Sequence, residues 1–140
     1  MIKTFNSLFV TMLGLGKIKF IPGTLGSLAT TVILYHLFHT LNISPNIILV
    51  SLIIIFVYSF YAVSSHIENY ENKDPGEIII DEFLGQSIPI YLYEISHGTT
   101  KNDDEAIIYY LLFFILFRYF DIMKPFPVSF FDKNFKNSFG

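Results

Sequence analysis

Residues 20–67 decide the fold of this chain: they read FIPGTLGSLATTVILYHLFHTLNISPNIILVSLIIIFVYSFYAVSSHI, and no Asp, Glu, Lys or Arg occurs among them. A helix needs about 20 apolar residues to cross a bilayer, so this stretch is too long for one span and suits two. The polar segment NISPN at residues 42–46 divides it into Thr24–Leu41 and Ile47–Ser65. The pattern therefore predicts a membrane hairpin, in which two spanning helices are joined by a short polar turn.

The composition of the whole 140-residue chain agrees with a membrane protein. Hydrophobic residues make up 52% of it and charged residues 15%, whereas ordinary soluble domains are roughly 25% charged. A chain of this length forms a single domain. The net charge of −3, with scattered Lys and Arg, leaves no basic face for nucleic acid. Because there is no Cys, disulfide scaffolds, iron–sulfur clusters, Cys-ligated zinc sites and thiol phosphatases are excluded.

Two further apolar segments follow the hairpin. Phe83–Tyr93 is short and contains Pro89, so it predicts a tilted span or a re-entrant segment, and Ala106–Met123 predicts a last span. Residues 1–17 resemble a signal peptide but lack a small-residue cleavage site, so we expect an amphipathic interfacial helix. The expected fold class is an all-α integral membrane helix bundle with about four membrane-embedded helices and this N-terminal interfacial helix.

Positive charges set the expected orientation. Lys3, Lys17 and Lys19 precede the first span, while the following turn carries no charge, so the positive-inside rule puts the N-terminus in the cytoplasm. If all four segments cross, the Lys residues after the last span also lie in the cytoplasm. A re-entrant third segment would leave them outside, so we expect four crossings.

The first of three polar clusters is PGTLGS, residues 22–27, where the first span begins. Pro and Thr often start helices and small residues let helices approach closely, which is the favoured explanation of this cluster taken alone. The functional alternative is an anion site at the helix N-terminus. There the free backbone N–H groups, that of Gly23 among them, would bind a phosphate with the help of Thr24 and Ser27.

The second cluster is DPGEIIIDEFLG, residues 74–85. Its first part, Asp74–Glu77, fits a capping box that begins a helix. Asp81 and Glu82 have no such explanation, because they are adjacent like charges placed after the helix has entered its apolar part. A cation is the simple way to keep such a pair ionised beside a membrane, so we favour a functional role over a solvated helix end.

The third cluster is FRYFDIMKPFP, residues 117–127. On a helix, Arg118, Asp121 and Lys124 recur every three residues and share one flank. Snorkelling and an ion pair at the membrane edge would explain them, and so would a phosphate bound by two cations beside a metal-binding acid. The two explanations have equal weight for this cluster alone. The four-crossing topology, however, puts all three clusters at the cytoplasmic boundary, which favours a common site.

The histidines indicate chemistry less clearly. His36 and His39 have a possible metal-ligand spacing, but they lie near the far end of the first span with no carboxylate nearby. An interfacial polar role is therefore expected for them. His66 and His97 are expected at helix ends.

The three clusters, in this order, resemble the phosphatidylglycerophosphatase A family of bacterial membrane enzymes. The matching stretches are PGTLGSL (residues 22–28), DPGEIIIDEFLGQ (residues 74–86) and FRYFDIMKPFPV (residues 117–128). GLGKIKFI before the first stretch also fits the family, so the resemblance covers most of the chain. The matching acids are Asp81, Glu82 and Asp121, and the matching cations are Arg118 and Lys124.

The resemblance implies a Mg²⁺-dependent phosphomonoester hydrolase that converts phosphatidylglycerophosphate to phosphatidylglycerol in phospholipid biosynthesis. It also implies one phosphatase domain over residues 1–140, embedded in the bacterial cytoplasmic (inner) membrane. A membrane phospholipid is its expected substrate, and no protein partner is expected. The family usually continues with a GIMLDD-like stretch and a last helix. We therefore expect this chain to be truncated at its C-terminus, and a metal site built partly from that stretch would be incomplete.

Hydrolysis of a phosphomonoester dianion needs charge neutralisation and a positioned water. We expect Asp81, Glu82 and Asp121 to hold Mg²⁺ and one of them to orient the water, while Arg118 and Lys124 bind the phosphoryl oxygens. The alternative from another class is a non-catalytic membrane helix module, or an inactive fragment of the phosphatase. The CDP-alcohol phosphotransferases rank last, because their paired Asp-Gly and Ala-Arg pattern is absent.

Overall fold

The computed structural model describes residues 2–67, 76–97 and 102–125. Within these ranges the secondary structure is entirely helical, which confirms the predicted all-α class. The elements are α1 (Ile2–Val10), the 3₁₀ turn η1 (Leu15–Lys17), α2 (Pro22–Tyr35), the π-helical turn η2 (His36–Thr40), α3 (Pro45–Ile67), α4 (Ile80–His97) and α5 (Asp103–Met123).

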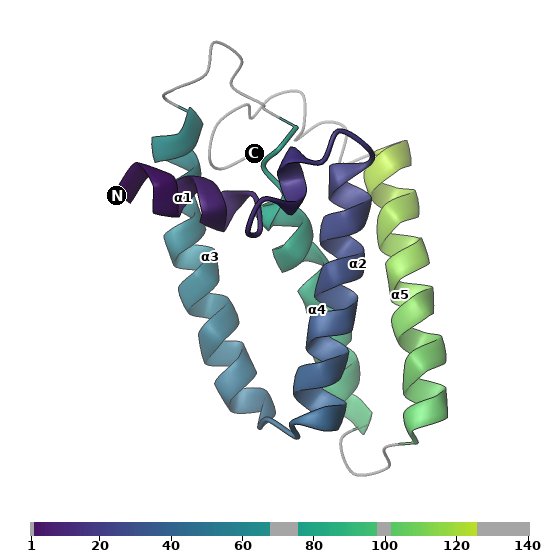
Figure 1. Ribbon diagram of the computed structural model, residues 1–140. Coiled ribbons are helices and arrows are strands. Elements are labelled where there is room, and N and C mark those ends of the chain that lie inside the picture. The colour runs from purple at the N-terminus through teal and green to yellow at the C-terminus, as the bar shows by residue number, and fades with distance from the viewer. Residues whose placement is uncertain (1, 68–75, 98–101, 126–140) are drawn as a thin grey trace.

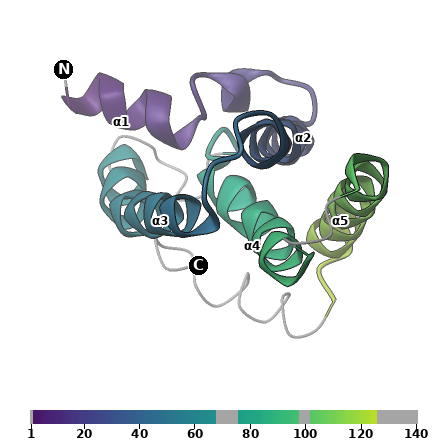
Figure 2. The ribbon, with the colours of Figure 1, turned by 90° about the horizontal axis from the view of Figure 1, so that it is seen from below.

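The helices α2, α3, α4 and α5 run along one another, and α1 lies across one end of the bundle (Figure 1). Seen along the bundle, α4 lies between α2, α3 and α5, and it contacts all three (Figure 2). We name the end covered by α1 the α1 end and the opposite one the far end. At the α1 end, α2 and α4 begin and α5 finishes, so three stretches distant in sequence meet there.

The predicted hairpin corresponds to α2 with η2, followed by α3. Pro22 and Pro45 each stand at the first helical position, where a missing N–H costs nothing. The connection between the helices falls within the predicted NISPN turn, and Asn42 takes a left-handed conformation there, with φ of 49°. Pro residues and the polar turn thus determine the helix limits.

The start of α4 differs from the prediction. The helix begins at Ile80 and not at Asp74, which lies outside the described residues, and Gly76–Glu77 form a turn. The Glu77 carboxylate lies 2.9 Å from Nε2 of His66 in the last turn of α3. The described contact of Glu77 is thus with another helix, and its predicted capping-box partner Asp74 lies outside the described residues. Asp81 and Glu82 therefore stand in the first turn of α4, where the helix dipole favours negative charge. They do not follow an earlier apolar turn of the helix, as the sequence predicts.

Two contacts hold the segment that leads into α4. The Ile79 N–H donates a hydrogen bond to the Val10 carbonyl at the end of α1, at 3.0 Å. Gly16 in η1 packs directly on the Glu77 backbone, where an added Cβ would collide with the Glu77 carbonyl. The position of the α4 start thus depends on a side chain being absent at Gly16.

We expect Gly16→Ala to lower the free energy of unfolding by about 2 kcal/mol, because backbone atoms must shift to make room for the methyl group. Thermal unfolding in detergent, followed by circular dichroism, measures the effect. Gly76→Ala is the matched control, because a Cβ at Gly76 meets open space. Equal unfolding temperatures for Gly16→Ala and the wild type would contradict the close packing.

The helix α1 rests on α3 through an aromatic contact. Phe9 meets Tyr58 edge to face, with ring centroids 4.9 Å apart, and the Tyr58 hydroxyl donates to Oδ1 of Asn6 at 2.7 Å. The outward face of α1 carries the exposed side chains of Phe5 and Leu8. This amphipathic character agrees with the interfacial helix that the sequence predicts.

Two of the described helices, α3 and α5, are long and apolar enough to cross a membrane. Both expose apolar side chains, such as Ile54 and Val57 on α3 and Ile115 and Ile122 on α5. Contiguous exposed apolar surface is uncommon on soluble proteins and suits a lipid environment. Crossings by α2 and α4 remain predictions.

Candidate functional site

The three polar clusters come together at the α1 end. Gly23 in the first turn of α2 marks the meeting point, because a Cβ there would lie 2.5 Å from Oε1 of Glu82 and 3.2 Å from Nη1 of Arg118. Glu82 stands in the first turn of α4 and Arg118 near the end of α5. One residue from each cluster thus comes close to a single point, where any side chain in place of Gly23 would displace the ends of Glu82 and Arg118.

Arg118 is held from two sides. Its Nη1 lies 3.0 Å from Oδ2 of Asp121, one turn later on α5, and 3.4 Å from the Ser27 hydroxyl. Ser27 is fully buried, and its hydroxyl donates to the Gly23 carbonyl at 2.9 Å. The Nε of Arg118 is buried without a hydrogen-bond partner among the described residues. The guanidinium is therefore fixed at one nitrogen and keeps a donor for a ligand.

The two adjacent acids differ in surface exposure, but partial burial among neighbouring atoms raises the pKa of both. Asp81 is exposed, whereas Glu82 is half-buried and its Oε2 has no hydrogen-bond partner within the described part of the chain. Burial raises the pKa of Glu82 to about 9, and the negative charges of Asp81 and Asp121 add to this effect. At neutral pH the Glu82 carboxyl group therefore keeps its proton unless a cation is bound nearby.

The remaining predicted residues also lie at the α1 end. Gly23 and Thr24 belong to the first turn of α2, whose backbone N–H groups have no partner within the helix. Lys124 ends α5 in a left-handed conformation, with φ of 40°, and it is exposed. The structure thus places every predicted site residue at one end of the bundle. Ser27 contacts the Gly23 carbonyl and Arg118, and its role in phosphate binding stays a prediction.

The site can be tested for its fit to a divalent cation. Among the described residues, no group of three or more His, Cys, Asp or Glu side chains has the geometry to hold a metal ion. Mg²⁺, however, is usually bound by only one or two carboxylates, with waters and substrate phosphate completing its shell. Asp81 and Glu82 supply oxygen donors of that kind, and Oε2 of Glu82 is buried without a partner in the described ranges. In donor chemistry the residues fit Mg²⁺.

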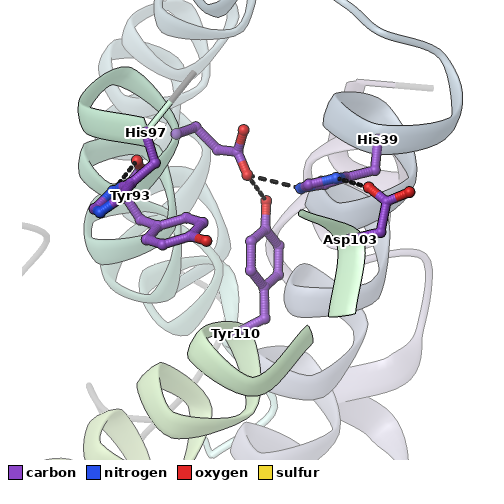
Figure 3. A network of polar contacts seen from close by, with 6 residues as sticks. His39, Tyr93, His97, Asp103 and Tyr110 are labelled. Carbon is purple, nitrogen blue, oxygen red and sulfur yellow. Dashed lines mark hydrogen bonds and ion pairs between the residues drawn. The ribbon is translucent and has the colours of Figure 1, made fainter. Parts of the chain in front are cut away.

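A second polar network lies at the far end, and the sequence analysis missed it (Figure 3). Nε2 of His39 lies 2.9 Å from Oε1 of Glu94, and Nδ1 of His39 lies 2.9 Å from Oδ1 of Asp103. The Tyr110 hydroxyl donates to the same Glu94 oxygen at 2.9 Å. The expectation that His39 has no carboxylate nearby is therefore wrong, because the end of α4 and the start of α5 each bring one.

The far-end network holds the His39 ring at both nitrogens, each of which lies within hydrogen-bond distance of a carboxyl oxygen. The His39 side chain is 3% exposed and that of Glu94 is 1% exposed. The network joins η2, α4 and α5, and it lies at the opposite end of the bundle from Arg118. We assign it to structure and not to the candidate site.

Comparison with known proteins gives consistent matches. The family model of phosphatidylglycerophosphatase A matches residues 8–140. A Haemophilus influenzae protein named phosphatidylglycerophosphatase A is 35% identical over 127 residues, which cover 91% of this chain and 71% of that protein. An Escherichia coli protein of the same name is 27% identical over 128 residues, covering 91% and 67%.

A third relative carries a different name. This Bacteroides thetaiotaomicron protein is provisionally named phosphatidylinositol-3-phosphatase, and it is 29% identical over 131 residues, covering 93% of this chain and 77% of that protein. No solved structure matches the chain.

Proposed function

The chain belongs to the phosphatidylglycerophosphatase A family, and from this premise we propose that it hydrolyses the terminal phosphomonoester of phosphatidylglycerophosphate. The products are phosphatidylglycerol and inorganic phosphate. The observation that carries the proposal is that Oε1 of Glu82 and Nη1 of Arg118 both approach Gly23 at the start of α2. An acid, a guanidinium and a helix N-terminus at one point are what a phosphate with its counter-cation requires.

Arg118 binds the phosphoryl oxygens in this proposal. A guanidinium forms directed, charge-assisted hydrogen bonds to phosphate, and Nε is the donor that lacks a partner among the described residues. The backbone N–H groups of Gly23 and Thr24 add a favourable helix dipole, and Lys124 adds a positive charge at the same end. Ser27 keeps Arg118 in place.

Of the three predicted acids, Asp81 and Glu82 would hold Mg²⁺, whereas Asp121 is paired with Arg118 and the described residues contain no group of three such ligands. When bound, Mg²⁺ neutralises negative charge on the phosphoryl oxygens and polarises the phosphorus centre. Asp81 is the most exposed of the three acids, so in this proposal it orients the attacking water and accepts its proton. The new bond joins the water oxygen to phosphorus, and the bond from phosphorus to the glycerol oxygen breaks. The glycerol alkoxide takes a proton from solvent.

The membrane arrangement follows the same proposal. The protein is multi-pass in the bacterial cytoplasmic membrane, with the α1 end facing the cytoplasm and α1 in the interface. The exposed Phe5 and Leu8 then contact lipid. The diacylglycerol tails of the substrate stay in the bilayer while the head group reaches Arg118.

We expect the purified chain in detergent–lipid micelles to release inorganic phosphate from phosphatidylglycerophosphate with Mg²⁺ present, and to stop when EDTA is added. Asp81→Asn removes a charge with little change of shape, and it should lower kcat/KM about 100-fold. Asp104→Asn is the matched control, because Asp104 is an exposed acid at the far end. Wild-type, Mg²⁺-dependent release by Asp81→Asn would remove the assignment.

The choice of head group is tested separately. The name of the Bacteroides thetaiotaomicron relative makes phosphatidylinositol 3-phosphate the competing substrate. Phosphate release from the two lipids is compared at equal surface concentration, and we expect the higher kcat/KM for phosphatidylglycerophosphate. Preference for the inositol lipid would contradict the proposed substrate and leave the phosphatase class intact.

A further inference from the structure

The proposed function gives no role to the side chain of Gln86. It lies on α4 one helical turn after Glu82, and it is fully buried. Its Nε2 donates a hydrogen bond to the hydroxyl of Thr31 on α2, at 3.1 Å. Its Oε1 is buried and has no hydrogen-bond partner among the described residues. Buried polar atoms are normally paired, so this oxygen requires an explanation.

The contact with Thr31 determines which way the Gln86 amide points. The Thr31 hydroxyl has one hydrogen, and it donates that hydrogen to the Ser27 carbonyl at 2.9 Å. The hydroxyl oxygen can therefore only accept from Gln86, so the atom facing it must be the amide nitrogen. The atom left without a partner is thus the carbonyl oxygen, an acceptor. Its missing partner is a hydrogen-bond donor or a cation.

A second acceptor without a partner stands next to it. Oε2 of Glu82 is likewise buried and unpaired within the described ranges. Residues four apart on a helix share one face, with Cβ atoms about 5–6 Å apart. A carboxylate oxygen and an amide carbonyl oxygen on one face are both ligand types of hard divalent cations. A cation can be coordinated by both oxygens, and a bridging water can donate a hydrogen bond to both, so measured cation binding distinguishes the two occupants.

We propose that Gln86 takes part in divalent-cation binding at the α1 end through its amide oxygen, and that Thr31 holds the amide in the required orientation. The inference rests on the proposed function, since the cation is the one assigned there to Glu82. Gln86 adds an uncharged oxygen ligand, which lies one helical turn after Glu82 on α4. Cation affinity can be measured without turnover, so the two proposals are separable.

The test is a titration of the full chain in detergent with Mn²⁺, a spectroscopic substitute for Mg²⁺, followed by electron paramagnetic resonance. Gln86→Leu should weaken Mn²⁺ binding at least about 10-fold, the lower end for residues that support a metal site. Gln86→Glu keeps an oxygen atom that can coordinate the cation, so this variant should bind Mn²⁺ at least as tightly as the wild type. Thr31→Val removes the hydroxyl that orients the Gln86 amide. It should weaken Mn²⁺ binding about threefold, which is less than the effect of removing the Gln86 oxygen itself.

Ser87→Ala is the control, because it removes a buried hydroxyl that donates to the Phe83 carbonyl, and it should leave the Mn²⁺ affinity unchanged. Wild-type affinity in Gln86→Leu would overturn the inference. If Gln86→Leu fails to fold, Thr31→Val decides in the same way, since unchanged affinity there overturns the role of the amide. A wild-type chain that releases phosphate but binds no Mn²⁺ would overturn the inference and leave the phosphatase assignment standing.

Discussion

Replacing Arg118 by Ala is expected to lower kcat/KM for phosphate release from phosphatidylglycerophosphate by about 10³-fold. Arg118 reaches Gly23 at the start of α2, as Glu82 does, and removing a preorganised donor to a phosphoryl group costs about 10²–10³ in rate. Because Arg118→Ala also removes a full positive charge, we expect the loss in kcat/KM to lie at the upper end of this range. The measurement is initial phosphate release against substrate surface concentration, at saturating Mg²⁺.

Two variants show whether this loss comes from chemistry. Arg118→Lys keeps the charge and loses the planar fork, so it should recover part of the activity and stay well below the wild type. Tyr119→Phe changes an exposed neighbour on α5 and should have wild-type kinetics. Activity of Arg118→Ala within a few-fold of the wild type would mean that Arg118 serves packing alone, as the ion pair with Asp121 by itself would suggest.

Replacing His39 by Leu is expected to lower the free energy of unfolding by about 3 kcal/mol, the upper cost of leaving a buried polar group without a hydrogen-bond partner. The His39 ring lies 2.9 Å from a buried Glu94 oxygen and 2.9 Å from an Asp103 oxygen, and a leucine side chain makes neither contact. Unfolding by a denaturing detergent, followed by circular dichroism, measures the loss.

His36→Leu is the matched control, because His36 is exposed in the same π-helical turn. It should unfold like the wild type. The turnover per folded molecule should stay unchanged in His39→Leu, since the far-end network lies at the opposite end from Arg118. Wild-type stability of His39→Leu would show that the network contributes little, and loss of turnover at full stability would show that it belongs to the site.

Local sequence signals predicted most of the helices. A charge-free stretch with Pro at two helix starts defines α2 and α3, because these signals act within a few residues. The start of α4 was predicted wrongly, because Glu77 is engaged by His66 on another helix. A capping pattern describes only what a residue can do with its neighbours in the chain.

The sequence predicted which residues form the candidate site, but it did not predict the contacts among them. Topology alone indicated that the three clusters share one end. The burial of Ser27 and the orientation of Gln86 depend on contacts between α2, α4 and α5 that leave no pattern in the chain. The His39 network had an available signal: in the four-crossing topology, Glu94 and Asp103 fall on the same side as the end of the first span.

The meeting of three helix ends at Gly23 bears on how the protein matures. Glu82 and Gly23 are made early, but Arg118 belongs to the last described helix, so a nascent chain still on the ribosome holds the acid without its guanidinium. Until α5 docks, the α1 end lacks the cation that the proposed function assigns to the phosphoryl group. In that proposal, a nascent chain that has not yet inserted α5 cannot bind the head group of a surrounding lipid.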